Sequence, residues 1–302
     1  MQKRSYILIY IAVAILLALT VCGSFLDLEI ANKVYIGQMP YENMFGIIFS
    51  YIGVIPTFVG WSFLGASIFY LSKKQIEDSK KRRWLTSFGV LLMVLSFFYF
   101  CNTILFSNTN VFEVHFMIAY SIGIAVLFVA GYFGYKLSQK SENGKKLLNQ
   151  AVFLAVVSLV ALVIISATKE IMCRPRFRYV LAMDDLAYFK NWWQSGKALK
   201  ANLAEGTITD EFSSFPSGHS AYSMFAIFMF PLLADYISGL KRFKTHLFVF
   251  GFIWWIATAF SRMTLGAHYL SDVAIAGLVT IFAYAVVSFA RKIYLKKQIK
   301  LI

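Results

Sequence analysis

Charged side chains are scarce in this chain. They make up 15% of its 302 residues, whereas an ordinary soluble domain has roughly 25%. Hydrophobic residues account for 59% of the sequence. This balance excludes a soluble globular protein and directs attention to the apolar segments.

Cysteine is also scarce. Cys22, Cys101 and Cys173 are far apart in the sequence, which excludes a cysteine-based metal site. Because three is an odd number, at least one thiol is unpaired within the monomer. A disulfide between two of them stays open, and so does the redox state of Cys173.

Long apolar segments are what the chain has in abundance. About 20 apolar residues in a helix cross a hydrocarbon core of about 30 Å. Eight segments reach or approach this length, and the seventh is the shortest. We therefore predict an all-α polytopic membrane helix bundle with about eight transmembrane helices, at 6–26, 44–72, 84–106, 114–135, 147–168, 219–239, 247–263 and 272–290.

The predicted spans lack ionisable residues near their midpoints, and the two halves of the chain show no internal repeat. Transporters and channels usually carry buried charges or broken helices at the membrane midplane. A transport function is therefore disfavoured.

The net charge of +14 is distributed unevenly. With a cytoplasmic N-terminus, the segments on the inner side hold 20 of the 29 basic residues, as the positive-inside rule requires. We expect both termini to be cytoplasmic and the basic loops to face lipid headgroups rather than nucleic acid. The predicted location is a bacterial cytoplasmic membrane, and the oligomeric state stays open.

One connection, 169–218, is much longer than the others, and loops of that length usually carry function. Within 184–204, Leu186, Phe189 and Trp193 recur at helical intervals, and Trp192 adds a second interfacial ring. We predict a helix lying on the membrane surface here. A lid over a lipid headgroup site is the functional alternative.

The stretch "SRMTLGAHYLSD" brings chemically capable residues together. His268 and Asp272 are four residues apart, so they share one face if a helix begins here. A carboxylate beside one ring nitrogen fixes the tautomer and leaves the other nitrogen basic. Arg262 precedes them and offers a planar fork suited to phosphate oxygens.

The stretch "SFPSGHS" lies just before the sixth predicted span. A helix N-terminus is a ready anion site, because its first N–H groups have no partner within the helix. Gly218 allows close approach of an oxygen, Ser217 can donate a hydrogen bond, and His219 stands ready to give a proton to a leaving group. We interpret this turn as part of a phosphate site.

The third element, "KEIMCRPRFR", ends the fifth predicted span. Lys169, Arg174, Arg176 and Arg178 lie within it. All three elements fall on the same predicted outer face. Cations around an anion, with one histidine to attack and another to protonate, are suited to phosphoryl transfer through a phosphohistidine.

At these residues the sequence resembles the type 2 phosphatidic acid phosphatases, also called lipid phosphate phosphatases. Their motifs are K-x6-R-P, P-S-G-H and S-R-x5-H-x3-D. The second is present as 216–219, and the third as Ser261-Arg262, His268 and Asp272. The first departs from the pattern, because Arg176 has the expected spacing from Lys169 but is followed by Phe177 instead of proline. Arg174, in the only Arg-Pro pair, is a second candidate.

The resemblance implies His268 as the nucleophile, Asp272 as its orienting residue and His219 as the general acid. It also implies that Lys169, Arg176, Arg262, Ser217 and the Gly218 amide hold the phosphoryl oxygens, with no metal and no cofactor. A six-helix core over 73–302 follows from the family fold, with an appended helix pair at 1–72.

The resulting hypothesis is a phosphatase of lipid phosphates or diphosphates, acting at the extracytoplasmic membrane face on a phosphorylated membrane lipid. Undecaprenyl diphosphate, phosphatidylglycerol phosphate and phosphatidate are all compatible substrates. Two alternatives stay open: a phosphotransferase with a lipid or sugar acceptor, and a non-catalytic protein that binds phospholipids.

Overall fold

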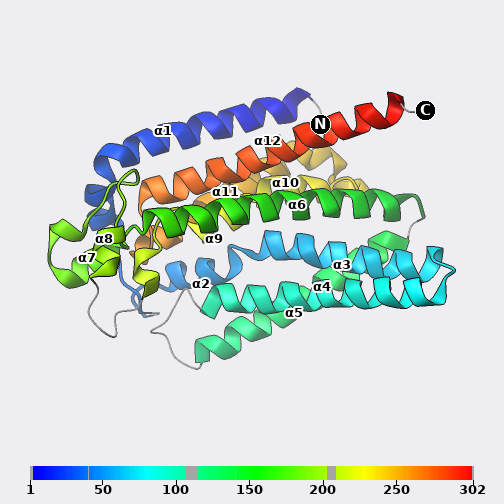
Figure 1. Ribbon diagram of the computed structural model, residues 1–302, viewed down its shortest axis with the longest axis horizontal. Coiled ribbons are helices and arrows are strands. Elements are labelled where there is room, and N and C mark those ends of the chain that lie inside the picture. Colours follow the sequence, from blue (N-terminus) through cyan, green and yellow to red (C-terminus); the bar gives the residue numbers. More distant parts are fainter. Residues whose placement is uncertain (1–2, 40, 106–113, 140, 203–208, 301–302) are drawn as a thin grey trace.

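The computed structural model describes residues 3–39, 41–105, 114–139, 141–202 and 209–300. In these ranges the chain is helical and contains no strand. The main helices form an elongated bundle (Figure 1). They are α1 (Lys3–Val34), α2 (Met44–Ile52), α3 (Ile55–Gln75), α4 (Ser79–Leu105), α5 (Val114–Gln139), α6 (Ser141–Met172), α9 (Gly218–Met224), α10 (Ala226–Leu233), α11 (Lys244–Thr264) and α12 (Leu270–Lys300).

The predicted polytopic helix bundle is confirmed. Within the described ranges, 7 helical segments are long and apolar enough to cross a membrane. The sixth predicted span, 219–239, is shorter than expected: α9 and α10 together cover only Gly218–Leu233. Pro231 lies inside α10 and has no N–H to continue the helix ladder. The prediction that 247–263 is the shortest span is wrong, because α11 extends into the polar residues that precede it.

The second predicted span is divided. α2 ends at Ile52, and α3 begins at Ile55 with Pro56 in its first turn. A proline there loses no helical hydrogen bond, because the first N–H groups of a helix have no partner within it. The corner between the two helices is held by Trp254, whose indole N–H donates to the carbonyl of Gly53 at 2.9 Å.

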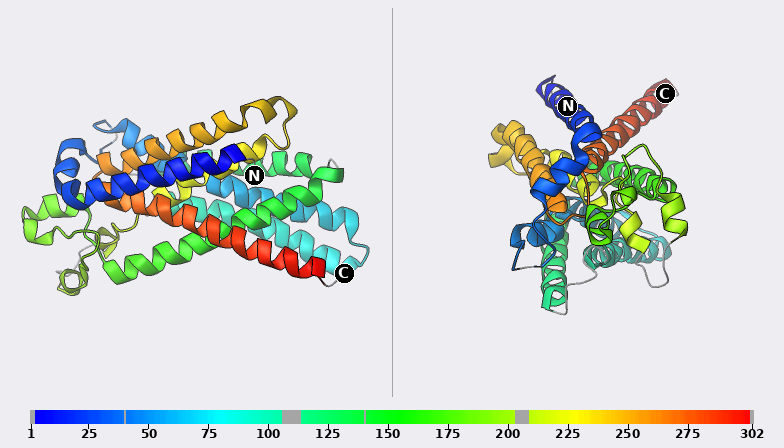
Figure 2. Two further views of the ribbon diagram at one scale, coloured as in Figure 1. Left: turned by 90° about the horizontal axis from the view of Figure 1, so that it is seen from above. Right: turned by 90° about the vertical axis from the view of Figure 1, so that its left-hand side faces the viewer.

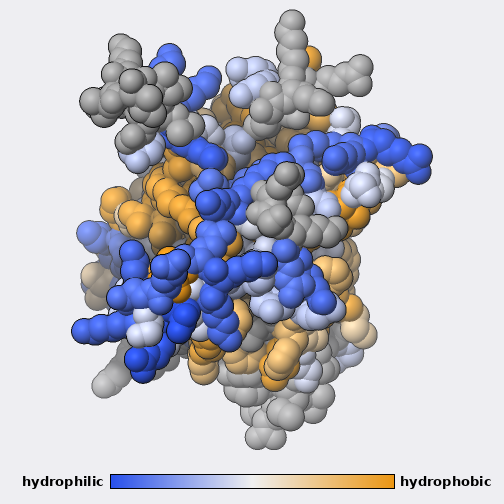
Figure 3. Space-filling model, turned by 90° about the vertical axis from the view of Figure 1, so that its right-hand side faces the viewer, coloured by the Kyte–Doolittle hydropathy of each residue, from blue (hydrophilic) through white to orange (hydrophobic). Residues whose placement is uncertain are grey.

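The two ends of the bundle differ in character. Both termini lie towards one end, whereas α7 (Phe177–Met183) and α8 (Lys197–Ala201) lie at the other (Figures 1 and 2). The end with the termini is strongly hydrophilic (Figure 3). The helix ends and turns there carry the basic residues of 73–83, 136–139, 141–146 and 241–244. A cytoplasmic location of this end stays a prediction.

The first helix packs against the last. α1 contacts α12, and the two helices approach closely at Gly23, since a side chain there would meet the Ser271 amide nitrogen at 2.7 Å. α3 lies among α4, α5 and α6. These contacts place the helices of 1–72 within the bundle, and a domain division at residue 72 stays a prediction.

The predicted surface helix over 184–204 is wrong. The segment contains η1 (Leu186–Tyr188) and α8 instead, separated by turns. Asp185 accepts a hydrogen bond from the Ala187 amide, a local bond that competes with a continuous helix. Trp192 stacks on Phe215 and donates to Ser24 at 2.9 Å, whereas Trp193 is half exposed. A lid role stays a hypothesis.

Candidate active site

Six of the nine predicted site residues line one cavity of about 200 Å³ at the end of the bundle away from the termini. The end of α6, the start of α9, the end of α11 and the turn before α12 all meet there. The lining residues are Tyr99, Leu162, Ile165, Ser166, Lys169, Arg176, Asp210, Gly218, His219, Tyr222, Arg262 and His268. Arg174, Ser217 and Asp272 are not among them.

The turn between α11 and α12 positions His268. Gly266 has a φ of +61°, a left-handed conformation that glycine adopts readily at the end of a helix. The turn folds back, so that the amides of Ala267 and His268 both donate to the carbonyl of Arg262. Arg262 and His268 are thereby brought to the same cavity.

His268 is held by one nitrogen and free at the other. Its Nδ1 donates to the carbonyl oxygen of Ser214 at 2.6 Å, which leaves Nε2 with the lone pair. Burial lowers the pKa of His268 to about 3; the positive charges of Arg176 and Arg262 add to this, and Asp272 opposes it. The imidazole is therefore neutral at ordinary pH, which is the nucleophilic form.

Asp272 was predicted to bond directly to His268, but its Oδ2 lies 3.8 Å from Nδ1. The carboxylate is occupied by other donors. It accepts from the Ser214 hydroxyl at 2.5 Å and the Tyr269 amide at 2.8 Å, and it pairs with Arg174 at 2.5 Å. Asp272 thus acts on the imidazole through its charge and through Ser214, which supplies the carbonyl that His268 contacts.

The two candidate arginines have different surroundings. Arg174 is fully buried between Asp272 at 2.5 Å and Asp27 at 2.8 Å, and it stacks over the ring of Tyr269. Arg176 lines the cavity and pairs with Asp210 at 2.6 Å. The spacing from Lys169 therefore identifies the arginine that faces the cavity, while the arginine of the Arg-Pro pair holds the surrounding structure.

Several polar atoms around the cavity are buried without a hydrogen-bond partner in the described part of the chain. They are Arg176 Nη1, Arg262 Nε and Nη1, and His219 Nε2. Buried polar and charged groups are stable only when paired. Unpaired donors from Arg176 and Arg262 around one cavity, with the ring nitrogen of His219 beside them, fit an anionic ligand that accepts from both arginines.

The charge of the cavity matches a phosphate group. Lys169, Arg176 and Arg262 are cationic, and Asp210 is the one acidic residue among the lining residues. Burial raises the pKa of Asp210, but Arg176 and Lys169 lower it further than burial raises it, so the carboxylate stays ionised. The lining side chains therefore carry a net charge of about +2, which balances a phosphate monoester with a charge of about −1.5 to −2 near pH 7.

The start of α9 supplies backbone to the cavity. A side chain at Gly218 would meet no atom within 4 Å, so its backbone faces open space. Ser217 is buried, and its Oγ accepts from the Ser220 amide at 3.3 Å as the N-cap of α9. The predicted contact of the Ser217 hydroxyl with phosphate stays a prediction.

Sequence reasoning missed Asp27, Asp210 and Ser214. Asp27 directly follows the first predicted span and reaches the site from α1, where it accepts from the amide and the hydroxyl of Ser271. A carboxylate at the edge of an apolar run was the only local signal. Asp210 and Ser214 lie in the long loop, where periodicity carries no information.

No group of three or more His, Cys, Asp or Glu residues that could hold a metal ion occurs in the described ranges. The three cysteines are free.

Comparison with known families gives one result. Residues 150–296 match the model described as the PAP2 superfamily, and this stretch contains every predicted site residue. Comparisons with curated proteins and with solved structures give no match. Both histidine motifs are intact and face a common cavity, and the PAP2 superfamily match over residues 150–296 is consistent with the type 2 phosphatidic acid phosphatase family.

Proposed function

We propose that this protein is a metal-independent phosphatase of membrane lipid phosphates or diphosphates that works through a phosphohistidine. The observation that carries the proposal is the cavity in which three cations and two histidines converge with unpaired donors. The PAP2 superfamily match supports phosphatase-type activity on phosphate esters.

In the first step, the lone pair on Nε2 of His268 attacks phosphorus. The bond from phosphorus to the leaving oxygen breaks, and His219 donates a proton to that oxygen from its imidazolium form, which the bound phosphate anion favours. Arg176, Arg262 and Lys169 stabilise the charge on the three remaining oxygens, which is the main catalytic need in phosphoryl transfer.

In the second step, water attacks phosphorus and the bond between phosphorus and nitrogen breaks. His219, now unprotonated, accepts a proton from that water, and inorganic phosphate leaves. Both histidines return to their starting forms, so the cycle balances without a further reactant.

A lipid substrate is favoured by where the cavity lies. It opens at one end of a bundle whose helices are apolar over membrane-spanning lengths. Under the predicted orientation this end is extracytoplasmic, because the basic loops lie at the other end. Undecaprenyl diphosphate, phosphatidylglycerol phosphate and phosphatidate are the proposed substrate candidates.

The test is phosphate release by detergent-purified protein, in excess chelator, from these three lipids and from glucose 6-phosphate. His268→Ala is the inactive variant, and His246→Ala is its matched control, because His246 is an exposed histidine at the opposite end of the bundle. We expect chelator-resistant release that is lost in His268→Ala and unchanged in His246→Ala.

The intermediate can be trapped directly. A brief reaction with substrate labelled in the phosphoryl group should transfer label to the protein as an acid-labile, alkali-stable phosphoramidate. No label, together with no phosphate release from any substrate, would contradict the proposal. Label that moves to a lipid or sugar instead of water would identify a phosphotransferase.

A further inference from the structure

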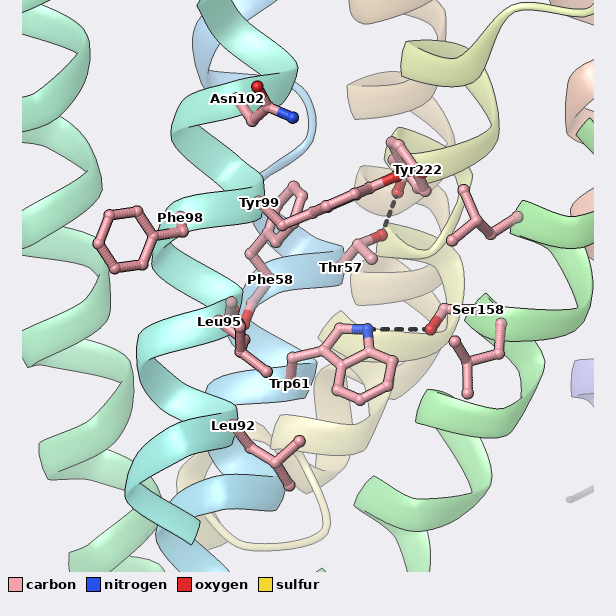
Figure 4. A pocket seen from close by; sticks show the side chains of 13 residues that line it. Thr57, Phe58, Trp61, Leu92, Leu95, Phe98, Tyr99, Asn102, Ser158 and Tyr222 are labelled. Atoms are coloured by element: carbon pink, nitrogen blue, oxygen red, sulfur yellow. Dashed lines mark hydrogen bonds between the residues drawn. The ribbon is translucent and has the colours of Figure 1, made fainter. Parts of the chain in front are cut away.

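A second, larger cavity lies beside the catalytic one. It has a volume of about 570 Å³, within the range of about 300 to 1,000 Å³ that is usual for ligand pockets. We call it the tail pocket. α3, α4, α6 and the first turns of α9 form its walls, and its lining is mostly apolar (Figure 4). The lining residues are Thr57, Phe58, Trp61, Leu92, Leu95, Ser96, Phe98, Tyr99, Asn102, Ser158, Leu159, Leu162 and Tyr222.

The tail pocket adjoins the catalytic cavity. Tyr99, Leu162 and Tyr222 line both. The hydroxyls of Tyr99 and Tyr222 are 3.1 Å apart, so they form a hydrogen-bonded pair at the junction. A molecule with its phosphate among the arginines could therefore extend past this pair into the tail pocket.

The tail pocket runs along the helices and is bounded at depth. Its residues on α4 extend from Asn102 to Leu92, ten residues or about 15 Å at a rise of about 1.5 Å per residue. Towards the deep end, Trp61 of α3 reaches across to α6 and donates from its indole nitrogen to Ser158 Oγ at 3.0 Å (Figure 4). Leu95 and Phe98 on α4 are about half exposed, which leaves the side towards the membrane open.

We propose that the tail pocket binds one hydrocarbon chain of the lipid phosphate substrate while its phosphate occupies the catalytic cavity. This inference rests on the proposed function. A chain in the bilayer is already in an apolar medium, so transfer to the pocket adds little affinity from burial alone. The pocket instead selects by shape and holds the phosphate at a set depth. Its α3 and α4 walls lie outside residues 150–296, so these helices determine substrate choice.

Two leucines one turn apart on α4 provide a matched test. Leu95 lines the tail pocket and is 51% exposed, whereas Leu91 is 49% exposed and does not line it. Leu95→Trp fills the pocket, and Leu91→Trp adds the same bulk to the same helix outside it. Neither residue lies in the catalytic machinery.

The measurement is kcat/KM for a long-chain alkyl phosphate and for a short water-soluble phosphate monoester. We expect Leu95→Trp to lower kcat/KM at least tenfold for the long-chain substrate and less than twofold for the short one. Leu91→Trp should change neither. An unchanged long-chain kcat/KM in Leu95→Trp, or an equal loss for both substrates, would overturn the proposal.

A binding measurement separates this proposal from the proposed function. In the His268→Ala background, which does not turn over, we expect Leu95→Trp to weaken binding of a fluorescent long-chain alkyl phosphate at least tenfold, and Leu91→Trp to leave it unchanged. If the wild type hydrolyses nothing, this binding difference still supports the pocket assignment. Equal binding by both variants overturns it, whatever the activity.

Discussion

Residues 150–296, which match the family model, and the helices before them contribute differently to the site. Every residue that lines the catalytic cavity except Tyr99 belongs to residues 150–296. The preceding helices supply Asp27, which holds Arg174, and most of the tail pocket. The lining of a cavity can therefore come almost entirely from one half of a chain, while helices outside that half supply supporting contacts and the walls of a neighbouring pocket.

The substitution with the largest expected effect lies in residues 150–296. His268→Ala should lose phosphatase activity by four or more orders of magnitude, since triad removal in serine proteases has effects on the order of 10⁴ to 10⁶. Its helical content and elution in detergent should match the wild type. Wild-type-like turnover in this variant would show that His268 is not the nucleophile.

The next largest effect distinguishes Arg176 from Arg174. Arg176→Ala should lower kcat about 10² to 10³-fold, as expected for loss of one donor to transition-state charge. Thermal unfolding in detergent should be little changed, because its partner Asp210 is partly exposed.

Arg174→Ala should act mainly on stability. It leaves Asp27 and Asp272 as buried carboxylates without their cation, and breaking a buried pair usually costs about 3 to 5 kcal/mol. We expect a markedly lower melting temperature. A stable, inactive Arg174→Ala protein beside a healthy Arg176→Ala protein would reverse our assignment of the two residues.

Asp27→Asn tests whether the preceding helices affect catalysis. The change keeps the shape but removes a charge that Arg174 and Ser271 contact. Losing a charged hydrogen bond is worth about 1.5 to 3 kcal/mol, so we expect about a tenfold or larger loss of kcat at unchanged KM. Glu29→Gln is the control, because Glu29 lies on the same helix in an exposed pair with Lys33. Equal effects of the two changes would contradict a positioning role for Asp27.

The smallest effect concerns pH. Burial and the nearby arginines lower the pKa of His268 to about 3. Because the pKa is lowered, the protonated, non-nucleophilic form accumulates only below that value. Single-turnover phosphoenzyme formation should thus change less than about tenfold between pH 7 and 5, mainly through the second ionisation of the substrate phosphate near pH 6.

Removing a neighbouring positive charge should change the pKa of His268. Arg262→Ala removes one positive charge that lowers the pKa of His268, so its acid limb should move to higher pH. An unshifted acid limb would show that Arg262 does not face the imidazole.

The sequence alone indicated where the long apolar helices lie, and it indicated six residues that line one cavity. Apolar run length identified the membrane helices because a span is a local property of about 20 residues. Motif spacing identified His219, Arg262 and His268 because each lies at or near a helix end whose position follows from its neighbours. The predicted helix boundaries were less accurate in two places. α11 begins earlier than predicted, among polar residues, and α10 ends earlier than predicted, two residues after Pro231.

Only the tertiary structure decided how these residues are supported. Asp27 and Ser271 are 244 positions apart, and Arg174 and Asp272 are 98 apart, so no local pattern links them. The bond from His268 to the Ser214 carbonyl and the tail pocket between α3, α4 and α6 depend in the same way on packing between distant helices. The sequence could indicate candidate residues because a motif consists of particular side chains at a fixed spacing, whereas the position and shape of a cavity depend on which helices meet.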